Sequence, residues 1–528
     1  MQQCGLTGSN IQWNVPKSLF TWINPESSNE MKGNWQKSMT RKPECPACFY
    51  FLPSSELREV KPRNVLMFID WLTKEWIEYY LDLFERLIRC GHRVEIVDIS
   101  AFTFPQQASS FTRSIHRDKA PQITVARELK PRWYGRFPKD ESGIQLKDSV
   151  ESHSASKFNG RTNLVSESID AFVLRKLSTN LYSQLGELDS SETIWTFQNG
   201  RLPHQQALLQ YCKHNGVEKL ILESNLYWKS HYWARPYPTQ DLESLQGEVR
   251  SRMHHVNSTQ RNLANKWFSE HASPKSKINI FTRRFQKPIR KASIPHQNLA
   301  PKSAAIFTSS SDEVVGLGAY WPWTGWSSQY ESFSRVSRIL RDMGYSITLR
   351  IHPNLQNKSL KAMREEYLHL KRFVKDFHVT VIGPSSSANS YELVDAAEIV
   401  VVSGSTIGLE ALQRGKKVIV TEHSSYDQLP GVLKINAQSD EKSIVHFLEE
   451  PFSIGKPSAT DWAAVQMSLG WSVQERPGIL KNDSLFGKLK YYLNWKTIAA
   501  YATLKLSRLL ENLPRKMLVR KISKLMQL

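Results

Sequence analysis

Apolar residues along this chain alternate between short runs typical of buried strands and longer stretches with helical spacing. Residues 65–70 read Val-Leu-Met-Phe-Ile-Asp and predict a buried strand, and apolar positions then recur every three or four residues from 76 to 90. Gly91 ends that predicted helix, and residues 93–99 follow as a second strand. A strand, a helix and a strand in this order predict a βαβ unit.

A similar alternation returns further along the chain. We expect ordered structure to resume at residues 171–174, a strand at 193–197, and a turn at Gln198-Asn199-Gly200-Arg201. A helix from about 204 to 215 and a strand at 219–223 follow, and helical spacing continues from 241 to 270.

The pattern is clearest in the second half of the chain. Predicted strands at 304–308, 346–351, 378–382, 398–402 and 417–421 alternate with predicted helices at 327–343, 358–375, 390–397 and 405–414. Short crossovers between successive strands predict a parallel, doubly wound sheet. The fold class that we predict is therefore α/β, with two Rossmann-like domains facing a cleft.

Composition shifts give the expected domain boundaries. They are an irregular, polar leader at 1–60, a first Rossmann-like domain at 61–272 with a basic insertion at about 100–168, a Lys/Arg/Pro/Ser-rich linker at 273–302, a second Rossmann-like domain at 303–487, and a basic tail at 488–528. The insertion is either a solvated loop or a segment that grips a charged acceptor.

Charge narrows the class of partner. The 528 residues include 70 Lys and Arg against 50 Asp and Glu, a formal net charge of +20, and 40% of residues are hydrophobic. This composition excludes a fibrous or wholly disordered protein and predicts an anionic partner. The basic residues lack the interleaved aromatic residues of a single-strand nucleic-acid platform, so we expect no nucleic acid as partner.

The five cysteines are an odd number and widely spaced, which favours a reducing compartment. Cys45 and Cys48 have the spacing of half a zinc site, although a plain loop explains them as well. We find no signal-peptide pattern at the start and no apolar run long enough to span a membrane, so we expect a cytoplasmic protein.

The tail at 488–528 carries ten Lys and Arg against one Glu, with apolar residues at helical spacing. Amphipathic helices of this kind either lie on an anionic membrane surface or pack back on the body of the protein. We therefore expect a cytoplasmic protein, which the first alternative would make peripheral on the inner membrane.

Two segments that follow predicted strands carry the candidate chemistry. Arg350-Ile351-His352-Pro353 ends one strand, where an imidazole could donate to a phosphate oxygen, although a histidine at a strand end is often structural. The second segment, Ser403-Gly404-Ser405-Thr406, leads into a predicted helix and offers hydroxyl and N–H groups to an anion. Ordinary capping of that helix by Ser405 would explain the same residues without a ligand. Glu410 lies one turn into that helix and could hold ribose hydroxyls.

Taken together, these segments resemble the capsule polysaccharide biosynthesis family, which is related to the Kdo transferases. The resemblance covers residues 304–423 and is carried by Phe307-Thr308-Ser309-Ser310-Ser311-Asp312-Glu313, Ile351-His352-Pro353-Asn354, Asp395-Ala396-Ala397, residues 403–410, and Gly415-Lys416-Lys417-Val418. Asn199-Gly200-Arg201 with Glu223 is similar to an element of the amino-terminal half of such proteins, although Asn225 stands where Gly is expected.

The resemblance implies a GT-B-like glycosyltransferase whose carboxy-terminal domain binds the nucleotide of an activated sugar. It implies a donor-nucleotide site at His352, Pro353, Ser403, Gly404, Ser405, Thr406 and Glu410, to which Arg350 is added as a weaker candidate. The sequence contains no Asp-x-Asp. Helix dipoles and basic side chains therefore replace a metal at the diphosphate, and we expect no metal and no cofactor beyond the donor substrate.

In such an enzyme the amino-terminal domain supplies the catalytic base that takes the acceptor proton. Asp70 and Glu223, at the ends of two predicted strands, are the candidates. Asn199 and Arg201 are candidates for the acceptor or sugar, with Arg201 placed to neutralise an acidic sugar or a phosphate. Trp321 and Trp323, in the loop with Trp326, either stack on a sugar ring or pack between domains.

We expect transfer of a sugar from a nucleotide-sugar to a surface or capsular polysaccharide or to its lipid-linked acceptor. Two alternatives stay open. One is a nucleotide-sugar 2-epimerase, which would release a free sugar epimer. The other is a non-catalytic GT-B-like assembly subunit of a polysaccharide export system, which would bind nucleotide without turnover.

Overall fold

The structure of the protein is a computed structural model. It describes residues 62–70, 74–103, 125–131, 150, 164–188, 192–224, 231–272, 302–309, 324–353, 355, 360–384, 386, 388–452, 458–473 and 517. The predicted leader, most of the basic insertion and of the linker, nearly all of the tail, and the predicted site residues Trp321 and Trp323 lie outside the described residues.

The amino-terminal lobe is built on a seven-stranded sheet with the order β13-β6-β5-β4-β1-β2-β3. Its strands are β1 (Asn64–Ile69), β2 (Arg93–Asp98), β3 (Val125–Glu128), β4 (Thr193–Gln198), β5 (Glu218–Ser224), β6 (His231–Arg235) and β13 (Trp471–Ser472). The strands from β5 to β3 run parallel, whereas β6 pairs antiparallel with both β5 and β13.

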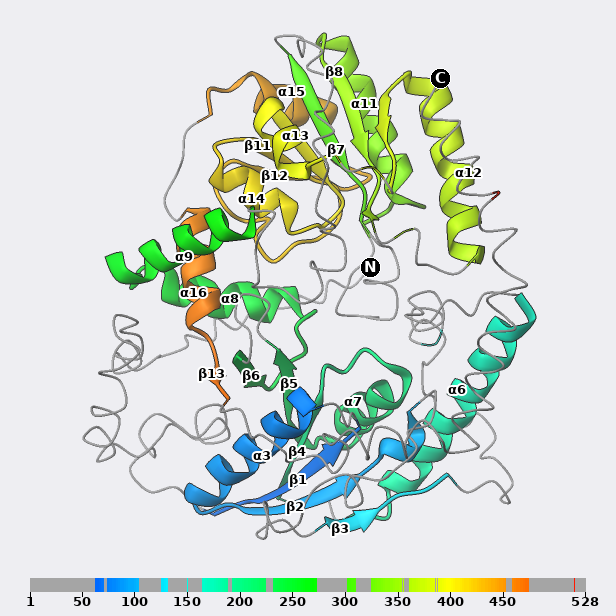
Figure 1. The fold of residues 1–528 in the computed structure, drawn as a ribbon, viewed down its shortest axis with the longest axis vertical. Coiled ribbons are helices and arrows are strands. Elements are labelled where there is room, and N and C mark those ends of the chain that lie inside the picture. Colours follow the sequence, from blue (N-terminus) through cyan, green and yellow to red (C-terminus); the bar gives the residue numbers. More distant parts are fainter. Residues whose placement is uncertain are drawn as a thin grey trace, which may run out of the picture.

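Helices cover both faces of this sheet (Figure 1). Helix α3 (Lys74–Arg89) buries Ile77, Leu83 and Leu87 against one face. Helices α6 (Leu164–Leu185) and α7 (Pro203–Asn215), with the short 3-10 helix η2 (Ser100–Phe102), cover the other face. Alternate residues of β1 pack into the cores on opposite faces of the sheet. Met67 packs on the face covered by α3 and Phe68 on the face covered by α6 and α7, as expected of a strand buried on both sides.

The carboxy-terminal lobe is built on a six-stranded parallel sheet with the order β12-β11-β10-β7-β8-β9. Its strands are β7 (Ser303–Phe307), β8 (Ser346–Arg350), β9 (Thr380–Ile382), β10 (Ile399–Val402), β11 (Lys417–Val420) and β12 (Val432–Lys434). Strands β7 and β10 are entirely buried, which explains their continuous apolar sequences.

Two helical layers enclose this second sheet. Helices α11 (Gln329–Asp342), α12 (Leu360–Phe377) and α15 (Glu441–Glu449) share a core on one face. Helices α8 (Leu242–Met253), α9 (Ser258–His271), α13 (Ser390–Ala396), α14 (Ile407–Gln413) and α16 (Ala459–Ser468) share a core on the other face. The predicted fold class, α/β with two Rossmann-like domains, is confirmed.

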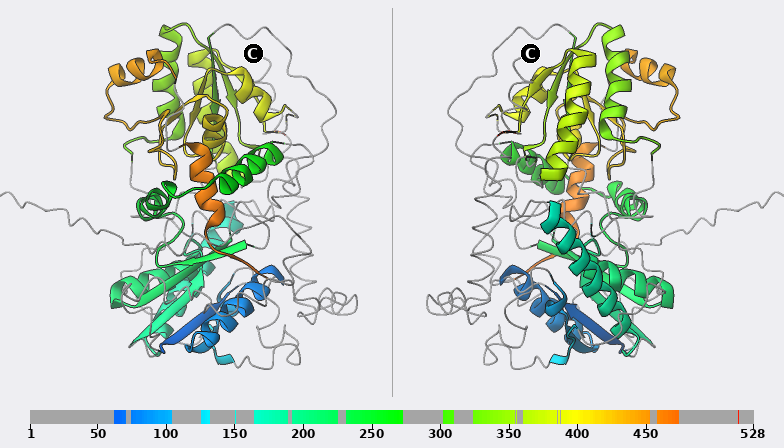
Figure 2. Two further views of the ribbon diagram at one scale, coloured as in Figure 1. Left: turned by 90° about the vertical axis from the view of Figure 1, so that its left-hand side faces the viewer. Right: turned by 90° about the vertical axis from the view of Figure 1, so that its right-hand side faces the viewer.

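Over the residues that the structure describes, the chain crosses between the lobes twice, which changes the expected domain boundary at 272. Helices α8 and α9, which were expected in the first domain, contribute Val249 and Phe268 to the core of the second sheet. After α16 the chain returns, and β13 pairs with β6 of the first sheet. Both views of Figure 2 place α16 between the two lobes. Helical spacing reveals that a helix exists but not which sheet it covers.

Several elements were not predicted. Residues 171–174 lie in the middle of α6, which begins at Leu164, inside the range expected for the insertion. Strand β3 reads Val-Ala-Arg-Glu at the edge of its sheet, and β13 has two residues, so neither carries an alternating apolar signal. Strands β6 and β12 and helices α15 and α16 were likewise not assigned from the sequence.

Candidate functional site

The predicted amino-terminal site residues come together at one edge of the first sheet. Asp70 follows β1, Asn199 and Arg201 follow β4, and Glu223 lies near the end of β5. Strands β1, β4 and β5 are neighbours and parallel, so their carboxyl ends meet at the same edge. Ligands of open α/β sheets bind at this edge.

A left-handed turn after β4 sets the geometry of the predicted acceptor residues. Asn199 has a φ of 51° and Gly200 a φ of 84°. Asn199 is among the residue types that tolerate this region, and Gly200 is free of the Cβ penalty. The Asn199 Oδ1 atom accepts from the Arg201 backbone N–H at 3.1 Å, and the amide of Gln206 donates to the Gly200 carbonyl at 2.7 Å.

Glu223 is half-buried and connected to this turn. The Asn199 side-chain amide donates to its Oε2, and the backbone N–H of Ser224 donates to its Oε1 at 2.9 Å. Burial raises the pKa of Glu223, and the hydrogen bonds from Ser224 and Asn199 and the positive charge of Arg201 partly oppose that rise. A carboxyl group with a raised pKa at a strand end is suited to proton transfer.

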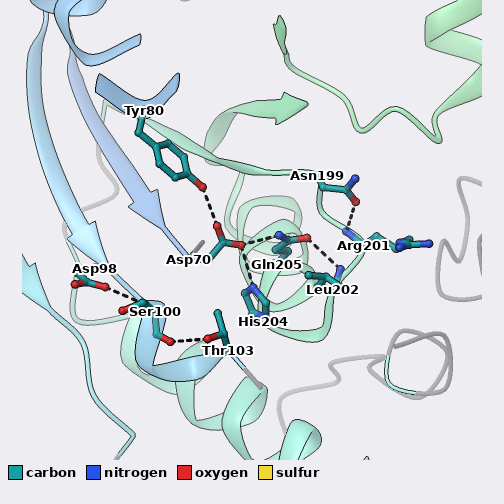
Figure 3. A network of polar contacts seen from close by, with 10 residues as sticks. All are labelled: Asp70, Tyr80, Asp98, Ser100, Thr103, Asn199, Arg201, Leu202, His204 and Gln205. Atoms are coloured by element: carbon teal, nitrogen blue, oxygen red, sulfur yellow. Dashed lines mark hydrogen bonds and ion pairs between the residues drawn. The ribbon is translucent and has the colours of Figure 1, made fainter. Parts of the chain in front are cut away.

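Asp70 lies in a buried network (Figure 3). Asp70 as a whole is 1% exposed. It accepts from the hydroxyl of Tyr80 at 2.8 Å, from the amide of Gln205 at 2.6 Å, and from Nε2 of His204 at 3.0 Å. Direct proton abstraction by Asp70, as expected from its position at a strand end, does not fit this environment, because its oxygens already accept from these internal donors.

A fourth group completes the network around Asp70. With its amide oriented to satisfy both neighbours, Gln198 donates to Asp70 Oδ1 at 3.3 Å and accepts from Nε1 of Trp76 at 3.2 Å. The carboxylate therefore holds the start of α7 against β1, β4 and α3. Its most direct chemical effect is to fix the ring of His204.

His204 and Gln205 were not predicted as site residues. They occupy the first turn of α7, which follows the Asn199-Gly200-Arg201 turn and begins with Pro203. A polar pair in the first turn of a helix after a buried strand is the signal that could have identified them.

The predicted nucleotide-site segments also share one edge, that of the second sheet. His352 follows β8 and Ser403 follows β10, and β7 lies between these two strands. The two segments are thus two strand spacings apart, roughly 10 Å. The backbone N–H of His352 donates to Oγ1 of Thr308, which follows β7, at 2.8 Å. This contact ties the ends of β7 and β8 together.

The residues of the segment 403–406 differ in exposure. Ser403 is buried, Gly404 and Ser405 are half-buried, and Thr406 is exposed at the start of α14. The hydroxyl of Tyr426 donates to the Ser405 carbonyl. A Cβ at Gly408 would lie 2.3 Å from that same hydroxyl, so the close approach of α14 to Tyr426 requires glycine there.

Arg350 and Glu410 are both held inside the second lobe. The Arg350 guanidinium donates to the carbonyls of Gly383 and Ser386, and burial lowers its pKa to about 10. Glu410 is 5% exposed, and burial raises its pKa to about 7, opposed by a hydrogen bond from Tyr391 and the charge of Arg414. Their roles toward a nucleotide stay predictions, and each has a structural role in the lobe.

Pro353 is half-buried directly after His352 and turns the chain away from the sheet. Of the tryptophans grouped with the predicted sugar-stacking loop, Trp326 is described. It is buried, and its Nε1 donates to the carbonyl of Thr421 at 2.8 Å. Trp326 therefore packs within the core of the second lobe.

Two further observations bear on the class of protein. Among the residues that the structure describes, no group of three or more His, Cys, Asp or Glu side chains is arranged to hold a metal ion. Within the same residues, no helix has both the length and the apolar character needed to cross a bilayer.

Comparison with known proteins identifies the carboxy-terminal lobe in part. Residues 327–429 match a family model described as "putative O-antigen biosynthesis protein". The matched segment contains His352 and the turn at 403–406. The predicted resemblance to proteins of surface-polysaccharide biosynthesis is confirmed over these residues. No curated protein matches this chain.

Solved structures with a similar fold include KpsC from Thermosulfurimonas dismutans, a beta-Kdo 2,4 transferase (TM-score 0.32, 12% identity, covering 53% of this chain and 84% of that one). Two others are S. aureus MnaA with UDP (TM-score 0.26, 13% identity, 82% and 97%) and Methanocaldococcus jannaschii UDP-GlcNAc 2-epimerase with UDP-GlcNAc and UDP (TM-score 0.27, 9% identity, 76% and 97%). Likenesses this distant do not identify an activity.

Proposed function

We propose that this protein is a GT-B-type glycosyltransferase that transfers a sugar from a nucleotide-sugar to a surface or capsular polysaccharide or to its lipid-linked acceptor. The observation that carries the proposal is the match of residues 327–429 to a model of O-antigen biosynthesis. That segment holds the two strand ends at which a nucleotide diphosphate would bind.

The two sheet edges would bind different substrates. The edge formed by β7, β8 and β10 would take the nucleotide, with the imidazole of His352 and the N–H and hydroxyl groups of Ser405 and Thr406 near the diphosphate. The edge formed by β1, β4 and β5 would take the acceptor, with Asn199, Arg201 and Glu223 around it. The donor site would work through donated hydrogen bonds rather than a metal.

The strongest competing function is a nucleotide-sugar 2-epimerase. A UDP-GlcNAc 2-epimerase in complex with UDP-GlcNAc and UDP is among the distant likenesses. An epimerase needs acid and base groups at the sugar carbon, and Glu223 with its raised pKa is suited to such a task as well. A non-catalytic assembly subunit would bind the nucleotide and convert nothing.

One experiment separates the three functions. The purified chain is incubated with cytidine, uridine, guanosine and thymidine nucleotide-sugars, with and without cell-envelope glycolipid, and the products are separated by chromatography and identified by mass spectrometry and NMR, which distinguishes epimers of equal mass. A sugar joined to the glycolipid supports transfer, and a free epimer contradicts transfer and supports the epimerase. Bound donor without conversion over the whole panel supports the assembly subunit.

The basic tail adds a proposal about location. Its ten Lys and Arg at residues 488–528 would hold the enzyme on an anionic membrane surface next to a lipid-linked acceptor. Removing residues 488–528 should abolish co-sedimentation with phosphatidylglycerol vesicles. Unchanged co-sedimentation would contradict the proposal.

A further inference from the structure

His204 and Asp70 form a buried dyad at the acceptor edge of the first sheet. The His204 side chain is 3% exposed and that of Asp70 is 2% exposed, and Nε2 of the imidazole lies 3.0 Å from Oδ2 of the carboxylate. The other ring nitrogen, Nδ1, is buried and has no hydrogen-bond partner within the described structure. A buried polar atom without a partner is uncommon and calls for an explanation.

The surrounding donors determine which nitrogen carries the proton. Asp70 accepts from Tyr80, Gln205 and, with its amide suitably oriented, Gln198. Because both oxygens of Asp70 accept from these donors, the His204 nitrogen that faces the carboxylate is placed to donate to it as well. In the neutral ring, Nδ1 then carries no proton and has a lone pair that can accept a hydrogen bond. Its missing partner is therefore a donor such as a hydroxyl group.

The position of the dyad identifies which hydroxyl. His204 lies in the first turn of α7, directly after the turn that carries Asn199 and Arg201 and at the edge that also holds Glu223. This is the edge that would take the acceptor. Tyr80 of α3 is a titratable group bonded to the dyad, through Asp70.

We propose that His204 is the catalytic base of the transfer and that Asp70 is its positioning residue. The inference rests on the proposed function. In the step, the acceptor hydroxyl gives its proton to Nδ1 while its oxygen forms the new bond to the anomeric carbon. The bond from that carbon to the phosphate oxygen breaks, and its electron pair leaves with the nucleotide. Asp70 stays ionised and stabilises the imidazolium.

The low exposure of His204 has a consequence for binding. The acceptor must displace the groups that cover Nδ1, which also keeps water away from the reacting centre until the acceptor is bound. Water that cannot reach Nδ1 cannot replace the acceptor, so the enzyme should hydrolyse its donor slowly.

Two substitutions separate the base from the structural role of the ring. His204→Gln keeps an N–H donor toward Asp70 but removes the basic nitrogen. His204→Asn instead places an oxygen near the position of Nδ1, but its shorter side chain does not reach Asp70. His92→Gln is the matched control, because His92 is also buried in this lobe, and its Nδ1 accepts from the backbone N–H of Arg63 at 3.2 Å.

The first measurement is independent of activity. Ring ¹⁵N spectra of the full chain, with the His204 signals identified by their loss in His204→Gln, should show Nε2 protonated and Nδ1 bare above neutral pH. A proton on Nδ1 would overturn the proposal, because that nitrogen could then not accept one from a substrate.

The second measurement is the rate of transfer against pH. His204→Gln should lower kcat roughly 100- to 10,000-fold and abolish the loss of rate at acid pH. Its melting temperature and nucleotide affinity should stay near those of the wild type, and His92→Gln should keep the wild-type pH profile. Wild-type rate and profile in His204→Gln would overturn the base, whereas absence of transfer in the wild type would overturn the proposed function and the base with it.

Discussion

Replacing Gly470 with alanine, which adds one methyl group, should detach strand β13 from the first sheet. It has a φ of +88°, and a Cβ added there would lie 2.0 Å from the backbone oxygen of Tyr232 in β6. Alanine would be strained by about 1–2 kcal/mol in this left-handed conformation. The collision is with backbone, so no side-chain rotation relieves it.

The expected loss follows from what residues 471–473 contribute. Nε1 of Trp471 donates to Oδ2 of Asp82 at 2.8 Å, and a hydrogen bond to a charged group contributes about 1.5–3 kcal/mol. Val473 is 8% exposed, and burying such a side chain contributes about 1.5–3 kcal/mol. If Gly470→Ala releases β13, we expect a loss on the order of 5 kcal/mol.

Differential scanning fluorimetry with limited proteolysis is the assay. Gly470→Ala should lower the melting temperature of the amino-terminal lobe by about 10 °C or more and expose the chain near residue 470 to protease. Gly247→Ala in α8 is the control, because a Cβ there meets nothing within 4 Å and alanine is favoured in a helix by up to about 1 kcal/mol. A Gly470→Ala protein as stable as the wild type would refute the pairing of β13 with β6.

Two further predictions concern buried carboxyl groups. The pKa of Glu410 is raised to about 7, so its contribution to stability is full below the unfolded pKa and is lost as pH rises through about 7. Glu410→Gln should therefore flatten the stability curve between pH 5 and 8, and an unchanged curve would contradict this. Nucleotide affinity measured on the same variant tests the separate prediction that Glu410 contacts the ribose. The second concerns Asn199→Ala, which removes a hydrogen-bond donor that lowers the pKa of Glu223. This variant should lose about 1 kcal/mol or more of stability in urea unfolding, and more at pH 8 than at pH 5. An equal loss at both pH values would contradict the coupling.

The sequence predicted the alternation of strands and helices where each element carries its own strong pattern. Strand β10 can be recognised because it is buried on both faces, so its four residues are all apolar. Helix α11 can be recognised because it is buried on one face, so its apolar residues recur at helical spacing. Strand β13 and the assignment of α8 and α9 to the second lobe depend on contacts more than 150 residues away in the chain, such as that of Trp471 with Asp82. No local period encodes such contacts.

The candidate site divides in a similar way. Strand ends could be located from the sequence, so Asn199, Glu223, His352 and Ser403 were placed at the correct sheet edges. Whether a polar residue at a strand end faces a ligand or the core depends on its tertiary partners. Asp70 illustrates the limit, because Tyr80, His204 and Gln205 enclose it.

The central claim is that the edge formed by β7, β8 and β10 binds the nucleotide of the donor. The most direct test is calorimetric titration of the wild type, His352→Ala and His369→Ala with CMP, UDP, GDP and dTDP. His369 is the control because it lies exposed on α12, stacked on Tyr330. We expect one nucleotide to bind the wild type and His369→Ala equally and His352→Ala at least tenfold more weakly, a difference of about 1.4 kcal/mol. Equal affinity in all three proteins, or no binding to the wild type, would contradict the claim.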